Sequence, residues 1–362
     1  MKMGVVGFPA VGKTTLFNLL TDSSVTTSRF GMSGRADPNI GMTRVPDDRL
    51  EGLSALFSPR KTTPATIEYV DLAGLRKEET VDGLALAPLR NADALLHVVR
   101  AFEDESLVHA EGNLDPARDI ATMETALLLS DHAVLSKRIQ RLQETIPKTG
   151  LADDRKELDL LLRVMEQIES EKPIREFSFQ DEEHRRLRGF AFLSAKPILH
   201  LINMGEKDLD KLQHFVETFH LEGVKDRPWT GLLPLSARIE EEIAQLSPPD
   251  AAAFQADLGL PDPCRPRVIR ASYQLVGLIS FFTAGEDECR AWSIPAHTPA
   301  REAAGVIHSD IQRGFIRAEV IRVDDLLKWK NMAAVKEKGL LRLEGKEYIV
   351  QDGDVINFRF NV

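Results

Sequence analysis

The segment that most constrains the fold is a glycine-rich loop near the N-terminal end of the sequence. Residues 7–14 read GFPAVGKT and match the pattern G-x-x-x-x-G-K-[ST]. Val5 and Val6 precede the loop and predict a short strand, and the run 15–20 that follows predicts a helix. Glycines let the backbone turn its N–H groups towards phosphate oxygens, and the helix N-terminus adds a favourable dipole. The sequence therefore predicts a strand, a phosphate-binding loop and a helix in direct succession.

The residues of this loop also predict how it would hold a nucleoside triphosphate. Lys13 is expected to reach the β- and γ-phosphates and to act as the catalytic cation. The hydroxyl of Thr14 is expected to bind Mg²⁺. The phosphate-binding residues predicted from the motif are Pro9, Ala10, Val11, Gly12, Lys13, Thr14 and Thr15.

Four further apolar segments predict strands of the same sheet. They lie at 66–70, 94–99, 197–202 and 231–235. Each is apolar through its length instead of alternating, as a strand buried on both faces of a parallel sheet requires. Helix-like stretches separate these segments, so the predicted fold class is α/β with a parallel sheet.

The strand at 66–70 ends in a second motif of a phosphate site. Asp71, Leu72, Ala73 and Gly74 form the pattern D-x-x-G. At this strand end Asp71 can hold the Mg²⁺ shell, and the N–H of Gly74 can sense the γ-phosphate. We therefore assign Asp71 to the metal site, with Thr14, and Gly74 to catalysis, with Lys13.

Two loops at the ends of the later strands predict the base specificity. Residues 203–206 read NMGE, where GTPases usually carry N-K-x-D. Glu206 replaces the aspartate that reads guanine, and its longer carboxylate should fit guanine poorly, which favours adenine. The end of the fifth strand offers a backbone N–H to the base. The base-binding residues predicted from the two loops are Asn203, Met204, Glu206, Ser236, Ala237 and Arg238.

The remaining sequence predicts an inserted arm and a terminal domain. Apolar residues recur at threes and fours over 120–146 and again over 158–168, with a break at 147–150, which predicts an antiparallel helical hairpin. Such stripes indicate packing, and the hairpin is either a connector or an arm that meets a partner. After a proline-rich stretch, a small mixed α/β region follows, with a strand at 280–284, a helix near 300–305 and two strands, 347–350 and 355–360, joined by a turn. The predicted domains are 1–118 with 190–265 for nucleotide binding, 119–189 for the arm and 278–362 for the terminal domain.

Charge and composition limit the partners. The chain of 362 residues has a net charge of −10, so a whole-chain basic footprint for nucleic acid is absent. The stretch 301–346 nevertheless carries a net charge of +3, which fits either RNA contact or a solvated face. No apolar run is long enough to span a membrane. The two cysteines, Cys264 and Cys289, form no CxxC pattern, which favours a reducing, cytoplasmic location.

Taken together, these motifs resemble those of the Obg-like ATPases, the YchF family of translation-factor-related P-loop NTPases. The resemblance covers nearly the whole chain and is weakest in the helical hairpin. The stretches that carry it are 7–18, 38–41, 45–50, 71–75, 97–102, 203–206 and 236–240, and most specifically 281–285, 290–292, 303–308, 314–321 and 343–362.

The resemblance implies a P-loop domain, an inserted helical arm and a C-terminal TGS domain with a β-grasp fold. It implies ATP in preference to GTP, slow hydrolysis with Mg²⁺, and association with the ribosome or ribosomal RNA in translation or stress responses. A nucleotide-binding adaptor with little hydrolysis and a GTP-preferring GTPase are the alternatives.

The sequence departs from the family pattern at several positions. Ala10 stands where the family usually has an asparagine that helps to bind potassium, so potassium stimulation is not expected. Arg35 stands where a threonine of the family can close over Mg²⁺, and an arginine cannot ligate the metal. Leu75 cannot orient water as the glutamine of Ras-like GTPases does. Glu78, Glu79 and Arg35 are further candidates for catalysis. The stretch 75–83 after D-x-x-G is less glycine-rich than in the family.

Overall fold

The computed structural model describes residues 1–21, 39–71, 86–104, 113–260 and 262–361. The chain forms two compact units, and each is made from separate stretches of sequence. The P-loop unit comprises Lys2–Met42 and Glu68–Ala271, and the C-terminal unit comprises Met1, Thr43–Ile67 and Ser272–Val362. Among the described residues, no helix is both long and apolar enough to cross a membrane.

A six-stranded sheet forms the centre of the P-loop unit. In spatial order its strands are β2 (Asn39–Arg44), β4 (Thr66–Asp71), β1 (Lys2–Val6), β5 (Ala94–Ala101), β6 (Ile198–Met204) and β7 (Thr230–Leu235). β1 pairs in parallel with both β4 and β5, and β6 pairs in parallel with β5 and β7. Every residue of β5 and β6 is buried. The five predicted strands and the parallel α/β class are confirmed.

The strand β2 was not expected from the sequence. Its side chains alternate, with Ile40 and Met42 exposed and Gly41 and Thr43 buried. This pattern is typical of a strand at the edge of a sheet, and β2 lies at the edge next to β4. A search for uniformly apolar segments therefore passes over it.

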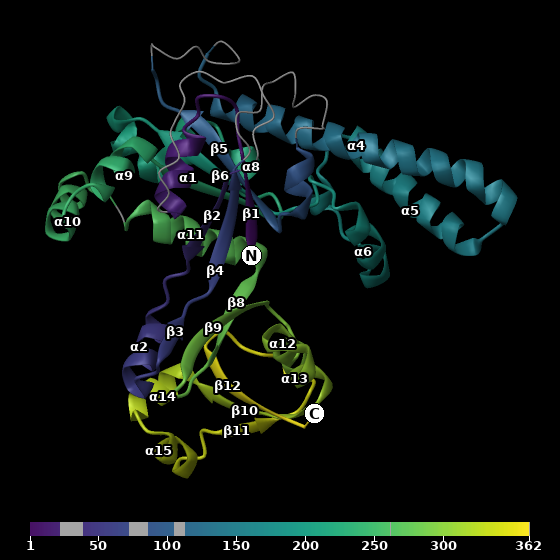
Figure 1. Ribbon diagram of the computed structural model, residues 1–362. Helices are drawn as coiled ribbons and strands as arrows, with labels where there is room; N and C mark the ends of the chain where they lie inside the picture. Colours follow the sequence, from purple (N-terminus) through teal and green to yellow (C-terminus); the bar gives the residue numbers. More distant parts are fainter. Residues whose placement is uncertain (22–38, 72–85, 105–112, 261, 362) are drawn as a thin grey trace. The chain divides into compact units, whose positions relative to one another are not determined.

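Helices cover the sheet and extend from it (Figure 1). α1 (Lys13–Thr21) packs beside α9 (Ala237–Ala244), and α4 (Pro116–Thr149) contacts β5. The other described helices of this unit are α6 (Asp181–Leu187), α7 (Phe215–Thr218), α8 (Glu222–Lys225), α10 (Pro248–Asp257) and α11 (Cys264–Val276), whose last residues belong to the C-terminal unit. Its 3₁₀ turns are η1 (Ala87–Asn91), η2 (Ile174–Glu176), η3 (Arg188–Phe190) and η4 (Glu206–His214).

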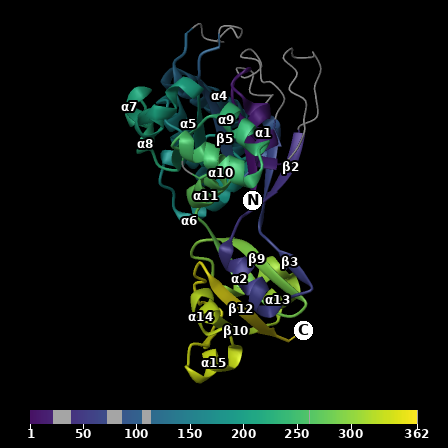
Figure 2. The same cartoon turned by 90° about the vertical axis from the view of Figure 1, so that its left-hand side faces the viewer.

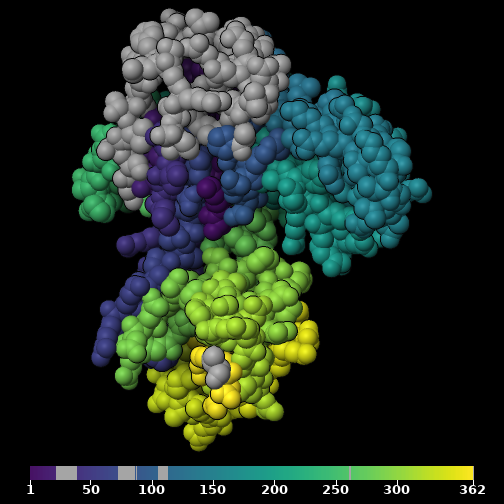
Figure 3. Space-filling model, turned by 45° about the vertical axis from the view of Figure 1, so that its right-hand side comes forward, coloured from purple at the N-terminus to yellow at the C-terminus, as the bar shows by residue number. Residues whose placement is uncertain are grey.

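The helical arm consists of α4 and α5 (Ala152–Glu169), which pack against each other and project from the unit (Figure 3). Asp115 caps the start of α4 by accepting from the N–H of Arg118, and Gly150 ends it in a left-handed conformation with φ of 64°. Pro147 lies inside the helix and does not end it, since α4 continues to Thr149 and the chain turns at Gly150. The predicted hairpin is confirmed. The buried cluster along it contains Leu128, Leu135, Ile139, Leu142, Leu160, Leu161, Val164, Ile168, Ile174, Leu187 and Phe192.

The C-terminal unit has a β-grasp fold, as expected. Its sheet has the order β11 (Arg342–Glu344), β10 (Phe315–Arg322), β12 (Asp354–Phe360), β8 (Leu278–Thr283), β9 (Glu288–Pro295) and β3 (Lys61–Thr63). β12 runs parallel to β8 and antiparallel to β10, and β8 and β9 are antiparallel. The helices of the unit are α2 (Asp48–Phe57), α12 (Ala300–Ile307), α13 (Ser309–Arg313), α14 (Val323–Trp329) and α15 (Met332–Glu337). Figure 2 labels all of these helices but α12.

The expected pair of terminal strands is wrong in one half. β12 covers the stretch at 355–360, but residues 347–350 form no strand and make a single bridge, between Ile349 and Pro299. Asp354 explains the turn that replaces the strand. Its carboxylate accepts from the hydroxyl of Tyr348 at 2.7 Å and from the N–H of Gln351 at 2.9 Å, which folds this segment back on itself.

The segment Thr43–Ile67 lies in a different unit from the one in which the sequence placed it. It belongs to the C-terminal unit, whereas the predicted nucleotide-binding domain included it in 1–118. The physical reason is β3, which adds to the edge of the second sheet in parallel with β9. Thr63 donates its hydroxyl to the Glu288 carboxylate at 2.5 Å across this pairing.

Candidate nucleotide-binding site

The phosphate loop connects β1 to α1, as the motif predicts. Gly7 has φ of 150° and Gly12 has φ of 95°, conformations that L side chains rarely adopt. A Cβ atom at Gly7 would lie 2.6 Å from the carbonyl oxygen of Val98, and one at Gly12 would lie 2.5 Å from Nδ2 of Asn203. Both glycines are therefore required by the conformation and by the neighbouring atoms.

Ala10 is the strained residue of the loop. Its φ of 59° is left-handed, which costs an L residue with a Cβ roughly 1–2 kcal/mol. Pro9 and Ala10 are exposed, whereas Val11 is buried. The outer part of the loop thus offers its backbone to solvent, and Val11 fixes it to the core.

Lys13 is a buried cation directly beneath the loop. Its ammonium donates to the carbonyl oxygens of Gly7 at 2.7 Å and Phe8 at 2.5 Å. Burial lowers the pKa of Lys13 to about 8, and the charge of Asp71 opposes this shift. The two carbonyls are acceptors that a phosphate oxygen can replace, so this ammonium is placed to bind an anion at the loop.

Asp71 is the second charged group of the site and ends β4. Burial raises the pKa of Asp71, while the charge of Lys13 and a hydrogen bond from the Asn39 side chain lower it in part. Its Oδ1 atom is buried and has no hydrogen-bond partner among the described residues. A buried carboxylate oxygen without a partner suits Mg²⁺ or one of its waters, since Mg²⁺ prefers oxygen ligands. The half-buried hydroxyl of Thr14, in the first turn of α1, is the other candidate ligand from the motif.

Asn203 joins three loops at the ends of the strands. It is buried at the end of β6, where its Nδ2 donates to the carbonyl of Val11 at 2.9 Å. Its Oδ1 accepts from the N–H of Ala237 at 2.9 Å. The side chain thus ties the phosphate loop to the loop between β7 and α9.

The other predicted base-binding residues have different surroundings. Met204 is 1% exposed, and its side chain packs in an apolar cluster with Ile120. Glu206 begins η4 and is exposed. Ser236 is buried and precedes α9, and its hydroxyl has no hydrogen-bond partner within the described part of the chain. Arg238 is exposed and pairs with Glu242 at 3.4 Å.

Several predicted residues lie outside the described part of the chain. These are Gly74, assigned to catalysis, and the loop residues Arg35, Leu75, Glu78 and Glu79.

A buried polar network behind the loop was missed as a unit by sequence reasoning. His97 on β5 lies opposite Val6 of β1, the strand that leads into the loop. Its Nδ1 lies 2.9 Å from Nδ1 of His200 on β6. Burial lowers the pKa of His97 to about 3, and the charge of Lys13 acts in the same direction. His200 in turn lies 3.8 Å from the carboxylate of Glu124 on α4. The available signal was a histidine in the middle of each of these two otherwise apolar strands.

The arrangement as a whole is suited to bind a polyphosphate. A buried ammonium, loop backbone beside a helix N-terminus and a carboxylate for a divalent cation converge at the same end of the sheet. These groups stabilise negative charge on phosphoryl oxygens, which is the main requirement for phosphoryl transfer.

Comparisons with known proteins agree with this geometry. A family model described as "50S ribosome-binding GTPase" matches residues 2–126, and the YchF-GTPase_C model, described as "Protein of unknown function (DUF933)", matches residues 278–361. The "Ribosome-binding ATPase YchF" of Bacillus subtilis is 40% identical, over 99% of this chain and 99% of the relative. The "Obg-like ATPase 1" of Oryza sativa subsp. japonica is 36% identical, over 100% of this chain and 92% of the relative.

A solved structure extends the likeness to the fold. The fold of this chain resembles the "Structure of the Schizosaccharomyces pombe YchF GTPase" with a TM-score of 0.84. That comparison covers 99% of this chain and 97% of the other, at 29% sequence identity. Both sequence and structure thus match over almost the full length.

Proposed function

This chain belongs to the YchF family of P-loop ATPases, and we propose that it binds and slowly hydrolyses ATP as a switch that acts on the ribosome. The observation that carries the proposal is the buried ammonium of Lys13 beneath a glycine-constrained loop, with the Asp71 carboxylate as its electrostatic neighbour. Enzymes of this class use Mg²⁺, which would balance the negative charge of the phosphate oxygens if Thr14 and Asp71 held it.

We propose that each group of the site has a separate role. The backbone of 9–15 holds the phosphates, and Lys13 moves from its loop carbonyls to the β- and γ-phosphate oxygens. Thr14 and Asp71 hold the Mg²⁺, directly or through its waters. Gly74 senses the γ-phosphate through its N–H. Leu75 cannot orient water, so the rate should depend on these charges and on a partner.

We further propose that the base is adenine, with guanine bound more weakly. Glu206 is exposed at the start of η4 and offers a longer carboxylate than the aspartate of N-K-x-D. Asn203 contributes by holding the loops in place, Met204 by its backbone, and Ser236, Ala237 and Arg238 by the N–H groups at the start of α9. The S. pombe relative is called a GTPase, so the alternative to test is that this chain prefers GTP to ATP.

The partner is proposed from the names of the relatives. Curated relatives are called ribosome-binding, and we propose that this chain binds the ribosome or its RNA in the cytoplasm. We also propose a division of the chain into domains. We place nucleotide binding in 1–118 and 190–265 without 43–67, the arm in 119–189, and the terminal domain in 278–362 with 43–67 added.

Single-turnover hydrolysis of ATP with Mg²⁺ tests the activity. Wild type should release phosphate slowly, and Lys13→Ala should lower the rate by a factor of roughly 100 or more, since a preorganised charge at the reacting phosphate is removed. Equal rates for the two proteins would end the enzyme assignment. Binding without turnover, even with ribosomes present, would instead indicate a nucleotide-dependent adaptor.

Competition experiments test the base. ATP and GTP compete with labelled ATP, and ATP should displace the label at a lower concentration. Stronger displacement by GTP would overturn the adenine proposal, and Glu206→Asp should then raise the affinity for GTP further.

A further inference from the structure

A cluster of lysines surrounds an exposed tryptophan in the C-terminal unit. Residues 328–338 read KWKNMAAVKEK, from the end of α14 to the C-cap of α15, and carry a net charge of +3. The rest of the stretch 301–346 has equal numbers of acidic and basic residues. The net positive charge of 301–346 therefore comes entirely from this segment. We call Lys328, Trp329, Lys330 and Lys338 the lysine–tryptophan surface.

Trp329 brings two of these lysines together. Its side chain is 38% exposed, with Nζ of Lys338 at 4.0 Å and Nζ of Lys328 at 5.5 Å from the ring centroid. Each contact is a cation–π interaction, but two like charges beside one ring also repel each other. A ligand with several negative charges would relieve this repulsion.

Among the residues that the structure describes, the lysines of this surface have no acidic partner. In the described part of the chain, none of Lys328, Lys330 and Lys338 forms an ion pair, and all three are exposed. The arginines of the neighbouring strands differ, because carboxylates of the same unit already pair with them. These pairs are Arg322–Asp354, Arg342–Glu344 and Arg359–Glu319.

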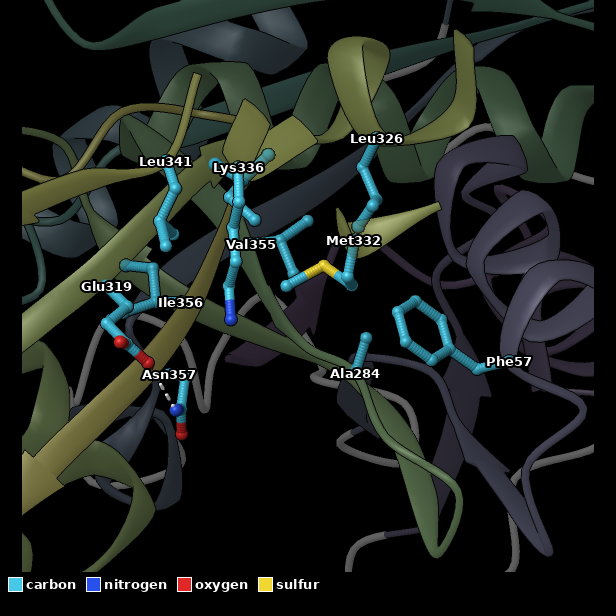
Figure 4. Close-up of a pocket in the computed structure, with 11 residues that line it drawn as sticks. Phe57, Ala284, Glu319, Leu326, Met332, Lys336, Leu341, Val355, Ile356 and Asn357 are labelled. Atoms are coloured by element: carbon cyan, nitrogen blue, oxygen red, sulfur yellow. Dashed lines mark hydrogen bonds between the residues drawn. The ribbon is translucent and has the colours of Figure 1, made fainter. Parts of the chain in front are cut away.

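An apolar pocket lies next to this surface. It has a volume of about 200 Å³, and Met332 and Lys336 of α15 line it together with Phe57, Leu326 and Val355. Figure 4 shows Met332 and Phe57 next to each other in the pocket, with the Lys336 ammonium on the side of Glu319 and Asn357. The pocket thus combines an apolar wall with a cation and polar groups, which suits a flat ring that carries hydrogen-bonding edges.

We propose that the lysine–tryptophan surface and this pocket bind single-stranded RNA. The lysines contact successive phosphates, one base stacks on Trp329, and a neighbouring unpaired base enters the pocket. An unpaired strand supplies one charge and one flat ring per nucleotide, so it matches both features, whereas an acidic protein segment matches only the charge. The inference rests on the proposed ribosomal function and assigns RNA contact to this part of the chain.

Binding of a labelled single-stranded 12-nucleotide RNA to the full chain, followed by fluorescence anisotropy, tests the proposal. The double variant Lys328→Gln, Lys338→Gln should weaken binding roughly tenfold and lower the slope of log affinity against log salt by about 1.4, because two phosphate contacts are lost. Trp329→Leu should weaken binding roughly tenfold, and Trp329→Phe should restore most of it by keeping a ring to stack on. A duplex of the same sequence should bind more weakly than the single strand.

The matched control removes two exposed lysines elsewhere. Lys148→Gln, Lys172→Gln changes the net charge equally in the helical arm and should leave RNA affinity unchanged. The proposal would be overturned if this control lost as much affinity, or if the wild-type protein bound no RNA. Equal competition by duplex RNA, polyglutamate or phosphatidylserine vesicles would also overturn it. ATP hydrolysis is measured on the same proteins. Normal hydrolysis with no RNA binding would refute this inference alone, whereas loss of hydrolysis in wild type would refute the proposed function.

Discussion

At the scale of single residues, the phosphate site depends on a charge that the fold disfavours. Lys13 has a pKa near 8 because it is buried, although Asp71 partly offsets this effect. A bound polyphosphate adds negative charge beside the ammonium and raises its pKa again. Nucleotide binding and protonation of this lysine are therefore linked.

The linkage predicts proton uptake on ATP binding. At pH 7 Lys13 is protonated with or without ATP, so its contribution to uptake is close to zero. At pH 9 most of the free protein has a neutral Lys13, and binding should take up nearly one proton while the affinity falls as the pH rises through 8. Calorimetry in two buffers of different ionisation enthalpy measures the uptake.

Lys13→Arg is the control for proton uptake, because a guanidinium stays charged across this range. If the wild-type protein and the Arg variant took up the same number of protons at pH 9, the proton could not be assigned to Lys13.

A second residue-scale prediction concerns Asn203. Asn203→Ala leaves the Val11 carbonyl and the Ala237 N–H without their partner, which should cost about 1–3 kcal/mol of stability. The loops should also lose their alignment, and ATP affinity should fall by about tenfold, or roughly 1.4 kcal/mol. Urea unfolding and nucleotide titration measure the two effects.

Asn113→Ala provides the matched control for Asn203. The same atoms are removed from an exposed residue of the same unit, whose partner is Arg118. Both stability and ATP affinity should change little, and an equal loss of ATP affinity in the two variants would contradict the bridging role of Asn203.

The residues of the site differ in how far the sequence could predict them. The order of strand, loop and helix around 7–14 follows from the motif because all its parts are adjacent in sequence. The contact between Asn203 and Val11 joins residues far apart in the chain, so it depends on the order of the strands. The burial of Met204 also depends on the packing of α4 against the sheet, which a motif does not contain.

At the scale of elements, two ion pairs hold the arm in different ways. Glu124 of α4 and Arg175 of η2 are both almost completely buried and paired, and Arg175 also donates to the Ser194 carbonyl. Arg138 and Glu157 pair at 2.7 Å between α4 and α5 with 40% and 18% of their side chains exposed. A buried pair with one partner removed leaves a desolvated charge, whereas an exposed pair is replaced by water.

The two pairs predict unequal costs. Arg175→Met should lower the free energy of unfolding by about 3–5 kcal/mol, and Arg138→Met by at most about 1 kcal/mol. The double variant Glu124→Leu, Arg175→Met should recover much of the loss because no charge remains buried. Equal losses for the two arginine variants in urea unfolding would contradict this account of the arm.

The elements that the sequence predicts well are those whose pattern is uniform. Strands buried on both faces and helices with one apolar stripe are visible in short windows. The edge strand β2 and the turn at 347–350 are not, since the first has mixed polarity and the second depends on hydrogen bonds to Asp354. The local pattern around Tyr348 and Ile349 favours a strand, and the side-chain hydrogen bonds to Asp354 override it.

At the scale of the whole molecule, the main feature is that neither compact unit is continuous in sequence. The C-terminal unit takes α2 and β3 from Thr43–Ile67, and Arg49 fixes this segment by pairing with Asp352 at 2.6 Å and lying over the ring of Phe282. Cys289 on β9 is fully buried, with its thiol facing the carbonyl of Leu53 in α2. A fragment 272–362 on its own would therefore lack one edge of its sheet and part of the cover over this cysteine.

This arrangement predicts a clear difference in thiol reactivity. Cys289 is the only cysteine of the fragment 272–362, and without α2 and β3 it should react with a thiol reagent at close to the rate of the unfolded chain. Joining 43–67 to the fragment through a flexible linker should restore the burial that raises the pKa of Cys289, and should slow labelling by roughly 100-fold or more. Labelling followed by absorbance measures both rates. If the thiol of the bare fragment were as protected as in the full chain, the terminal domain would be complete without the inserted segment, and the division of the molecule into discontinuous units would lose its energetic basis.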